Sequence, residues 1–256
     1  MIDQIGINLY TLQPLLKTPV EIACTLKAVR EIGYPAVQVS GIGPIEPVEL
    51  KKIVDDLGLV ICATHTGYDD LTKNLNQIID KHKLWNCSQI AVPSIPADLR
   101  GGAEGYIKFA EEMTEAGKKL AGVGMTLSYH NHAFEFERFN GKLGIEWIYE
   151  KSDPKYFQAE IDTYWVQYGG GDPVAWCEKM INRLPLVHLK DYGIVNNQPT
   201  YMEVGEGNLD MTAIIKICRK AKTKWYLVEQ DVCPRSPLES AGISYRNLKR
   251  IMQSLA

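Results

Sequence analysis

The 256-residue sequence lacks the features that mark secretion, membrane insertion or disulfide cross-linking. Its six cysteines form no CxxC pair, and several lie in apolar stretches, as Cys62 does in LVICATH. This pattern favours buried free thiols in a reducing compartment, and we therefore expect a cytoplasmic protein. The opening MIDQIGINLY has no basic segment before an apolar one, and no apolar run approaches the roughly 18 residues that span a bilayer. We expect no contact with a membrane.

An excess of charge of one sign is also missing. The chain has 28 Lys+Arg against 31 Asp+Glu, a net charge of −3, and no long basic run. Such a chain does not suit binding to the phosphates of nucleic acid or to anionic lipid, so we expect a small-molecule partner and no nucleic acid. Hydrophobic residues make up 45% of the sequence, which is ample for one large buried core.

The sequence does contain a regular alternation of short β-branched runs and longer segments with helical periodicity. The short runs predict strands at 5–10, 36–40, 60–65, 89–94, 125–132, 157–163, 186–191 and 225–231. The longer segments predict helices at 18–33, 46–57, 69–85, 103–121, 143–151, 171–182, 209–221 and 237–254. Each strand is too apolar for a sheet with one solvent face, so we predict an α/β fold, a single (β/α)8 TIM barrel over residues 1–256. An open doubly wound sheet is the alternative, but no GxGxxG follows the first strand.

Polar side chains gather where the predicted strands end. They occupy alternate positions, namely His130 and His132, Glu160 and Asp162, His188 and Lys190, and Glu229 and Asp231. Alternate residues of a strand point to the same side, and the C-terminal strand ends of a barrel form its active site. One such residue is more often a structural hydrogen-bonding group, but uncompensated charge at several strand ends is expensive to bury and indicates function. Imidazoles and carboxylates from separate strands can hold one divalent cation with open positions.

Aromatic and polar residues nearby complete the predicted rim. Tyr10, His65 and Trp165 follow or end their strands, and an aromatic ring there could stack on the apolar face of a sugar or cyclitol. The Gly-rich VGEGNLD at 204–210 precedes a helix and could receive a phosphate, but Glu206 opposes an anion, so we favour an ordinary turn. No arginine cluster is present, which favours a substrate without phosphate.

The motifs IGINLYT, VICATH, LSYHNH, EIDTYW, HLKD, VGEGNLD and VEQD follow one another across nearly the whole chain. In this order they resemble the xylose isomerase-like barrels, and specifically the sugar phosphate isomerase/epimerase family, related to inosose dehydratases and ketose 3-epimerases. The resemblance implies one divalent metal ion (Mn2+, Mg2+, Co2+ or Zn2+) held by residues of the fifth to eighth strands. Carried over, the ligands are Asp162, His188, Glu229 and either Glu135 or, as the alternative, His130.

Two departures from the family pattern bear on the reaction. Gln38 stands where many relatives carry Glu, and Trp165 stands where ketohexose 3-epimerases place a His, which argues against a plain ketohexose epimerase. We therefore predict a metal-dependent sugar isomerase or epimerase that removes the proton α to a carbonyl through a metal-stabilised enediolate. A lyase or dehydratase acting on a keto-inositol or 3-keto-glycoside is the second expectation, and a non-catalytic sugar-binding barrel is the alternative of another class.

The expected roles follow from this chemistry. Candidate catalytic residues are His130, His132 and Glu229 as bases and Lys190 as the stabiliser of a developing oxyanion. Candidate substrate-binding residues are Tyr10, His65, Trp165, Lys190 and Asp231. An endonuclease resembling endonuclease IV is disfavoured, because the chain has only five His and a slight negative charge. Apolar helix faces could support a homodimer, although no stretch identifies the interface.

Overall fold

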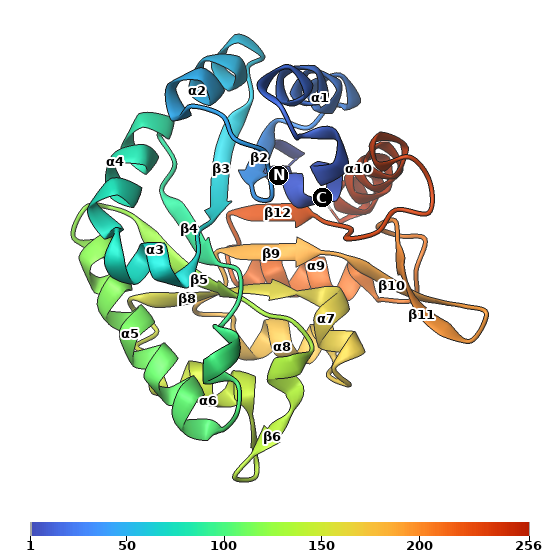
Figure 1. Ribbon diagram of the computed structural model, residues 1–256. Helices are drawn as coiled ribbons and strands as arrows, with labels where there is room; N and C mark the ends of the chain where they lie inside the picture. Colours follow the sequence, from blue (N-terminus) through green and yellow to red (C-terminus); the bar gives the residue numbers. More distant parts are fainter. Residues whose placement is uncertain (1, 256) are drawn as a thin grey trace.

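The protein forms a closed barrel of eight parallel strands surrounded by helices, as Figure 1 shows for this computed structural model, which describes residues 2–255. Around the barrel the strand order is β1, β12, β9, β8, β5, β4, β3, β2. The strands are β1 (Ile5–Asn8), β2 (Ala36–Val39), β3 (Val60–His65), β4 (Gln89–Val92), β5 (Thr126–His130), β8 (Phe157–Asp162), β9 (Leu186–Leu189) and β12 (Trp225–Val228). The predicted barrel is confirmed, and each of its strands lies within a predicted run.

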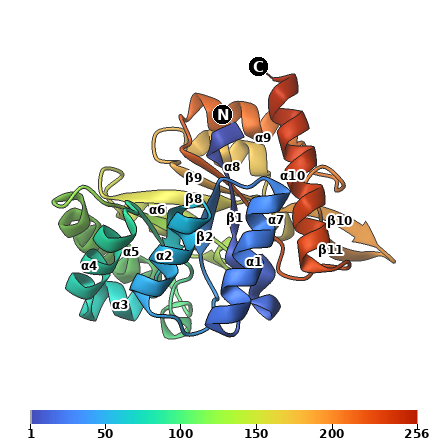
Figure 2. The same ribbon diagram turned by 90° about the horizontal axis from the view of Figure 1, so that it is seen from above.

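The main helices cover the outside of the barrel. They are α1 (Pro19–Ile32), α2 (Pro47–Asp56), α3 (Tyr68–Lys73), α4 (Leu75–Trp85), α5 (Ala103–Ala121), α6 (Gly144–Lys151), α7 (Thr163–Tyr168), α8 (Pro173–Lys179), α9 (Met211–Lys220) and α10 (Pro237–Ser254). Figure 2 shows α1 and α10 side by side, where the last helix completes the ring next to the first. With helices outside and side chains packed inside, nearly every strand residue is buried, which explains the continuous apolar runs.

Local sequence signals set where the helices begin and end. Thr18 caps α1 by accepting a hydrogen bond from the Glu21 N–H, Pro19 follows as the first helical residue, and Gly33 ends the helix with a φ of +118°. The predicted helix at 69–85 is two helices, because Asn74 leaves the helical conformation between α3 and α4. The helix predicted at 171–182 is shorter, and Asp172 caps it as α8.

Several elements were not predicted. Thr163, predicted as the end of a strand, is the first residue of α7. Two hairpins lie outside the barrel, β6 (Arg138–Phe139) with β7 (Lys142–Leu143) and β10 (Asp191–Val195) with β11 (Gln198–Met202). The second hairpin projects away from the barrel body (Figure 1). Short 3-10 turns occur at Ile2–Gln4, Leu9–Leu15, Ala97–Leu99 and Phe134–Phe136.

The barrel interior changes from apolar to polar along the strands. A buried apolar cluster in the strands is formed by Ala36, Cys62, Ala63, Ala91, Leu186 and Leu227. Space there is tight, since a Cβ added at Gly6 would lie 2.8 Å from the Leu227 Cδ2. Two positions further along the same strands, and therefore on the same side, come Gln38, His65, His188 and Glu229. The apolar layer thus supports a polar layer at the C-terminal ends.

The cysteines are free thiols, as the sequence predicted. None of the six forms a disulfide, and Cys62, Cys87, Cys177 and Cys218 are buried. Among the described residues, no helix combines the length and the apolar character that crossing a membrane requires.

Candidate metal centre

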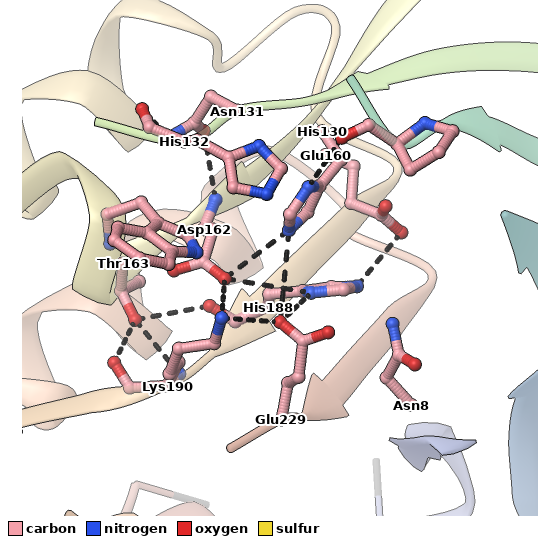
Figure 3. Close-up of polar contacts among 12 residues, drawn as sticks. Asn8, His130, Asn131, His132, Glu160, Asp162, Thr163, His188, Lys190 and Glu229 are labelled. Atoms are coloured by element: carbon pink, nitrogen blue, oxygen red, sulfur yellow. Dashed lines mark hydrogen bonds and ion pairs between the residues drawn. The ribbon is translucent and has the colours of Figure 1, made fainter. Parts of the chain in front are cut away.

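Four side chains from four neighbouring strands meet in the polar layer of the barrel. One ligand atom from each of His130, Asp162, His188 and Glu229 lies within 4.8 Å of the other three, and all four side chains are buried. Nδ1 of His188 is 3.0 Å from Oε2 of Glu229, and Nε2 of His130 is 3.4 Å from Oδ2 of Asp162. Figure 3 shows these side chains pointing toward one another. We call this set the four-residue group.

Strand register brings these residues together. In the parallel pairing of β5 with β8, His130 lies opposite Glu160, and in the pairing of β8 with β9, Asp162 lies opposite His188. Glu229 directly follows β12, which pairs with β9, and its N–H donates to the Leu189 carbonyl. The group therefore depends on the pairing of four adjacent strands and not on any local motif.

The two carboxylate oxygens of Asp162 have different partners. Oδ1 accepts a hydrogen bond of 3.0 Å from the Trp165 N–H and caps α7, while Oδ2 faces the group. The Asp162 N–H in turn donates to the side-chain oxygen of Asn131, at 3.0 Å. The hydroxyl of Thr163 donates to the Lys190 carbonyl at 2.8 Å and ties the end of β8 to the chain after β9. These contacts fix the carboxylate direction.

Lys190 contacts two members of the four-residue group and is fully buried. Its ammonium is 2.7 Å from Oε2 of Glu229, 3.1 Å from Oδ2 of Asp162 and 3.0 Å from Oδ2 of Asp231. Burial would lower the pKa of Lys190, but the three carboxylates outweigh it and hold that pKa well above its usual value. Lys190 is not among the residues that line the cavity, but its ammonium lies 5.1 Å from the centroid of the Trp165 ring on the cavity wall. Its expected contact with a substrate hydroxyl stays a prediction.

A second set of hydrogen bonds orients His188. Its Nε2 lies 2.7 Å from the side-chain oxygen of Gln38, which also accepts from Asn8, while the Gln38 amide nitrogen donates to Glu160 at 2.8 Å. Because Gln38 uses its oxygen here, Nε2 of His188 carries the proton, and Nδ1 faces the group. Glu160 also bonds Nε2 of His65 at 2.8 Å. The sequence placed Glu160 on this face but assigned it no role.

His130 has the properties of a neutral metal ligand. Its Nδ1 is 3.2 Å from the Pro93 carbonyl, which leaves the lone pair of Nε2 directed at the group. Burial, together with the nearby His188 and His65, keeps the pKa of His130 well below its ordinary value. A metal-binding imidazole of this kind commonly donates its other N–H to a carbonyl.

Glu135, the other candidate for the fifth-strand ligand, lies outside the four-residue group. Its carboxylate accepts hydrogen bonds from the Tyr129 hydroxyl and from the His132 N–H, the latter at 2.9 Å. Burial raises the pKa of Glu135 to about 7. Of the two candidates left open by the sequence, the structure brings only His130 to the other three residues.

The donor set and the charge of this region both fit a divalent cation. Two imidazoles and two carboxylates are ligands that Zn2+, Mn2+ and related ions accept. Among the described residues, four buried or largely buried carboxylates, those of Glu160, Asp162, Glu229 and Asp231, face the ammonium of Lys190 and at most two charged imidazoles, those of His188 and His65. Negative charge therefore remains in excess, and buried excess charge is strongly unfavourable without a counterion.

A cavity of about 710 Å³ opens over the four-residue group. The predicted residues on its wall are Tyr10, His65, His130, His132, Trp165, Glu229 and Asp231, and the residues that the sequence did not suggest include Ser40, Ser94, Arg100, Phe134 and Tyr201. The His132 ring stacks on Phe134 at 5.5 Å and contacts Trp165 at 5.5 Å. Nδ1 of His132 and Nε1 of Trp165 are buried and have no hydrogen-bond partner in residues 2–255.

The Gly-rich loop at 204–210 already holds an anion from its own chain. The N–H groups of Gly205, Gly207 and Leu209 donate to the buried carboxylate of Asp191, at 2.8, 3.2 and 3.2 Å. These amides are therefore not available to a phosphate, in agreement with the favoured interpretation of the loop as a turn.

Comparison with known proteins gives one family. A family model described as xylose isomerase-like TIM barrel matches residues 26–250. The rhizopine catabolism protein MocC of Rhizobium meliloti is 22% identical over 91% of this chain and 82% of that protein. An inosose dehydratase of Clostridium tetani is 26% identical, but the match covers 54% of this chain and only 52% of that enzyme.

Solved structures agree with the family. The crystal structure of a sugar phosphate isomerase/epimerase from Parabacteroides distasonis superposes with a TM-score of 0.80, covering 96% of this chain and 94% of that chain. The two sequences are 24% identical, so this likeness supports the fold. The family predicted from the motifs is confirmed, and the chain belongs to the xylose isomerase-like TIM-barrel family.

Proposed function

We propose that this protein is a divalent-metal-dependent sugar isomerase or epimerase that removes the proton α to a carbonyl and forms an enediolate. The observation that carries the proposal is the four-residue group at the floor of a cavity. The group contains two imidazoles and two carboxylates, and the region around it has an excess of negative charge. His130, Asp162, His188 and Glu229 would hold one ion, Mn2+, Mg2+, Co2+ or Zn2+. When bound, such an ion supplies Lewis acidity to a carbonyl oxygen and a neighbouring hydroxyl.

His132 is the residue best suited to move the proton. It lies on the cavity wall with an unpaired Nδ1, and its ring is held by Phe134 and Trp165. Burial, with the neighbouring His130 and the positive Lys190, lowers the pKa of His132 to about 3, so the imidazole is neutral with a free lone pair but is a weak base in the metal-free protein. His130 and Glu229, the other expected bases, are engaged in the four-residue group.

Lys190 serves this chemistry through its contacts with three carboxylates. It stays protonated and holds Asp162, Glu229 and Asp231 in a fixed arrangement, so its charge favours negative charge that develops at the floor of the cavity. Tyr10, on the wall above, offers a ring to the apolar face of a sugar or cyclitol.

A lyase or dehydratase on a keto-inositol or 3-keto-glycoside is the second candidate function. Loss of a β-hydroxyl requires a second group that can protonate the leaving oxygen, and the Asp231 carboxyl lies on the wall of the same cavity as His132. The similarity to an inosose dehydratase supports the same candidate.

Metal binding is tested by thermal unfolding with and without Mn2+. In the parent, Mn2+ at a hundred times its Kd should add about 2.7 kcal/mol of stability, or roughly 5 to 10 °C in Tm. Asp162→Asn keeps an oxygen to cap α7 but removes the charge, and it should lose this shift together with bound Mn2+. Glu135→Gln is the matched control and should keep both. Equal metal content in Asp162→Asn and the parent would refute the ligand assignment.

The reaction is tested in D2O with Mn2+ and a panel of ketoses, keto-inositols and 3-keto-glycosides. Deuterium incorporated at the carbon α to the carbonyl supports proton abstraction, and the product separates epimerase, isomerase and lyase. His132→Ala should lose the exchange while it keeps the Mn2+-dependent rise in Tm. Exchange that continues unchanged in His132→Ala would remove His132 from the proposed role.

A further inference from the structure

Arg100 stands out among the cavity-lining residues as a cation without a counterion. It follows the 3-10 turn Ala97–Leu99 in the loop between β4 and α5. Among residues 2–255, no Asp or Glu oxygen lies within 4.0 Å of its guanidinium. The two acidic groups on the same cavity wall, Glu229 and Asp231, are both engaged by Lys190. Arg100 therefore forms no direct ion pair among the described residues, although its charge lowers the pKa of the buried Glu135 from a greater distance.

The guanidinium is held rigidly by neighbours on one side. Nε donates to the Ile95 carbonyl at 3.0 Å, and Nη2 donates to the same carbonyl at 2.8 Å and to the Ser94 hydroxyl at 2.8 Å. The guanidinium carbon also lies 3.8 Å from the centroid of the Phe134 ring, a cation–π contact. A fixed guanidinium loses little side-chain entropy when it binds a ligand.

Counting the donors identifies the part of Arg100 that remains available. A guanidinium has five N–H groups, and the three hydrogen bonds to Ile95 and Ser94 use those of Nε and Nη2. The two N–H groups of Nη1 have no partner among the described residues. They can donate to the oxygens of one oxyanion, and hydrogen bonds between charged groups are the strong ones.

The cavity is large enough for a ligand that reaches both Arg100 and the four-residue group. Its volume of about 710 Å³ lies in the upper half of the 300–1,000 Å³ typical of small-molecule sites. Phe134 connects the two regions, because its ring contacts Arg100 on the wall and stacks with His132. His132 in turn lies 5.0 Å from the ring of His130.

We propose that Arg100 binds an oxyanion of the substrate, a carboxylate or a phosphate, so that the substrate is an anionic sugar or cyclitol derivative. The substrate would bind with its carbonyl at the four-residue group and its anionic group at Nη1 of Arg100. This orientation rests on the proposed function. The lack of an arginine cluster in the sequence had favoured a substrate without phosphate, whereas the structure provides one preorganised guanidinium for either anion.

Binding of simple probes tests this assignment without turnover. D-glucose, D-glucuronate and D-glucose 6-phosphate are titrated into the parent protein, and affinities are measured by calorimetry in EDTA and again with Mn2+. At least one of the anions should bind tenfold or more tightly than glucose, about the strength of a charged hydrogen bond. Preference for glucuronate or for the phosphate identifies which oxyanion the site takes. Equal affinity for all three probes would overturn the proposal.

Two variants then test whether Arg100 causes the preference for anions. Arg100→Gln should bind the anions and glucose equally, whereas Arg138→Gln, on the exposed β6–β7 hairpin, should retain the parent's preference. An anion preference that survives in Arg100→Gln would place the anion elsewhere and overturn the proposal.

A second pair of variants keeps Arg100 and its loop contacts. Ser94→Asp puts a carboxylate beside the guanidinium and should abolish the preference for anions, while the neutral Ser94→Asn should keep it. If both Ser94 variants retain the preference, the proposal fails even where Arg100→Gln does not fold. Because these measurements need neither metal nor turnover, their outcome is separate from that of the deuterium-exchange test.

Discussion

The buried Glu135 predicts a pH-dependent loss of stability that a single substitution should remove. Its side chain has no solvent exposure, and burial raises its pKa from 4.5 to about 7. A folded-state pKa above the unfolded value means that the folded protein binds the proton more tightly. Stability from this residue is therefore greatest at low pH, falls as the pH rises from 4.5 to 7, and stays low above 7.

The magnitude follows from the difference in pKa. Each pKa unit corresponds to about 1.4 kcal/mol, so ionised Glu135 should destabilise the fold by about 3 kcal/mol above pH 7. Glu135→Gln has nearly the same shape and no charge. The Tyr129 hydroxyl, which donates to Glu135, can instead accept from the amide nitrogen, and the His132 N–H can still donate to the amide oxygen. The variant should thus match the parent at pH 4.5 and exceed it at pH 8.

Urea unfolding of both proteins at several pH values between 4.5 and 8, in EDTA, measures this difference. Other groups titrate over the same range, but subtracting the parent from the variant cancels their contributions. The difference in free energy of unfolding should grow by about 3 kcal/mol, or roughly 6 to 12 °C in Tm at pH 8. A difference that does not change with pH would refute the reasoning.

Two further predictions concern buried charges. Lys190→Met leaves three carboxylates without their shared cation, so the metal-free protein should lose about 3–5 kcal/mol of unfolding free energy. Urea unfolding measures this loss, and a loss below about 1 kcal/mol would contradict the role of Lys190. Asp191→Asn turns an NH2 group toward the amides of the 204–210 loop, and it should lose about 2–4 kcal/mol and become sensitive to proteolysis there. Asp210→Asn, which still caps α9, is the matched control and should change stability by less than about 0.5 kcal/mol.

Much of the fold could be predicted because each barrel strand is buried on both faces. Such strands appear in the sequence as short, mostly apolar runs, as in β2 and β9. The helices between them carry ordinary caps, as at Thr18 and Gly33. The two hairpins were missed because they lie outside the barrel and their strands are short and partly polar. The break at Asn74 was missed because the helical periodicity continues across it.

The candidate site was predictable where position along a strand determined side-chain direction. Asp162 and His188 could be assigned to one face from the alternation of each strand alone. The choice between His130 and Glu135 depended on the path of the chain after β5, which no periodicity encodes. Arg100 could not be identified for the same reason, since a loop of irregular conformation brings it to the cavity.

The divided carboxylate of Asp162 has a consequence for how such a barrel can diversify. The same side chain starts α7 through Oδ1 and faces the cavity floor through Oδ2, so a change at this position would disturb a helix and the chemistry together. Trp165 and Phe134 contact His132 but are not members of the four-residue group. New substrate preferences can therefore arise through substitutions at Trp165 and Phe134 while the four-residue group stays unchanged.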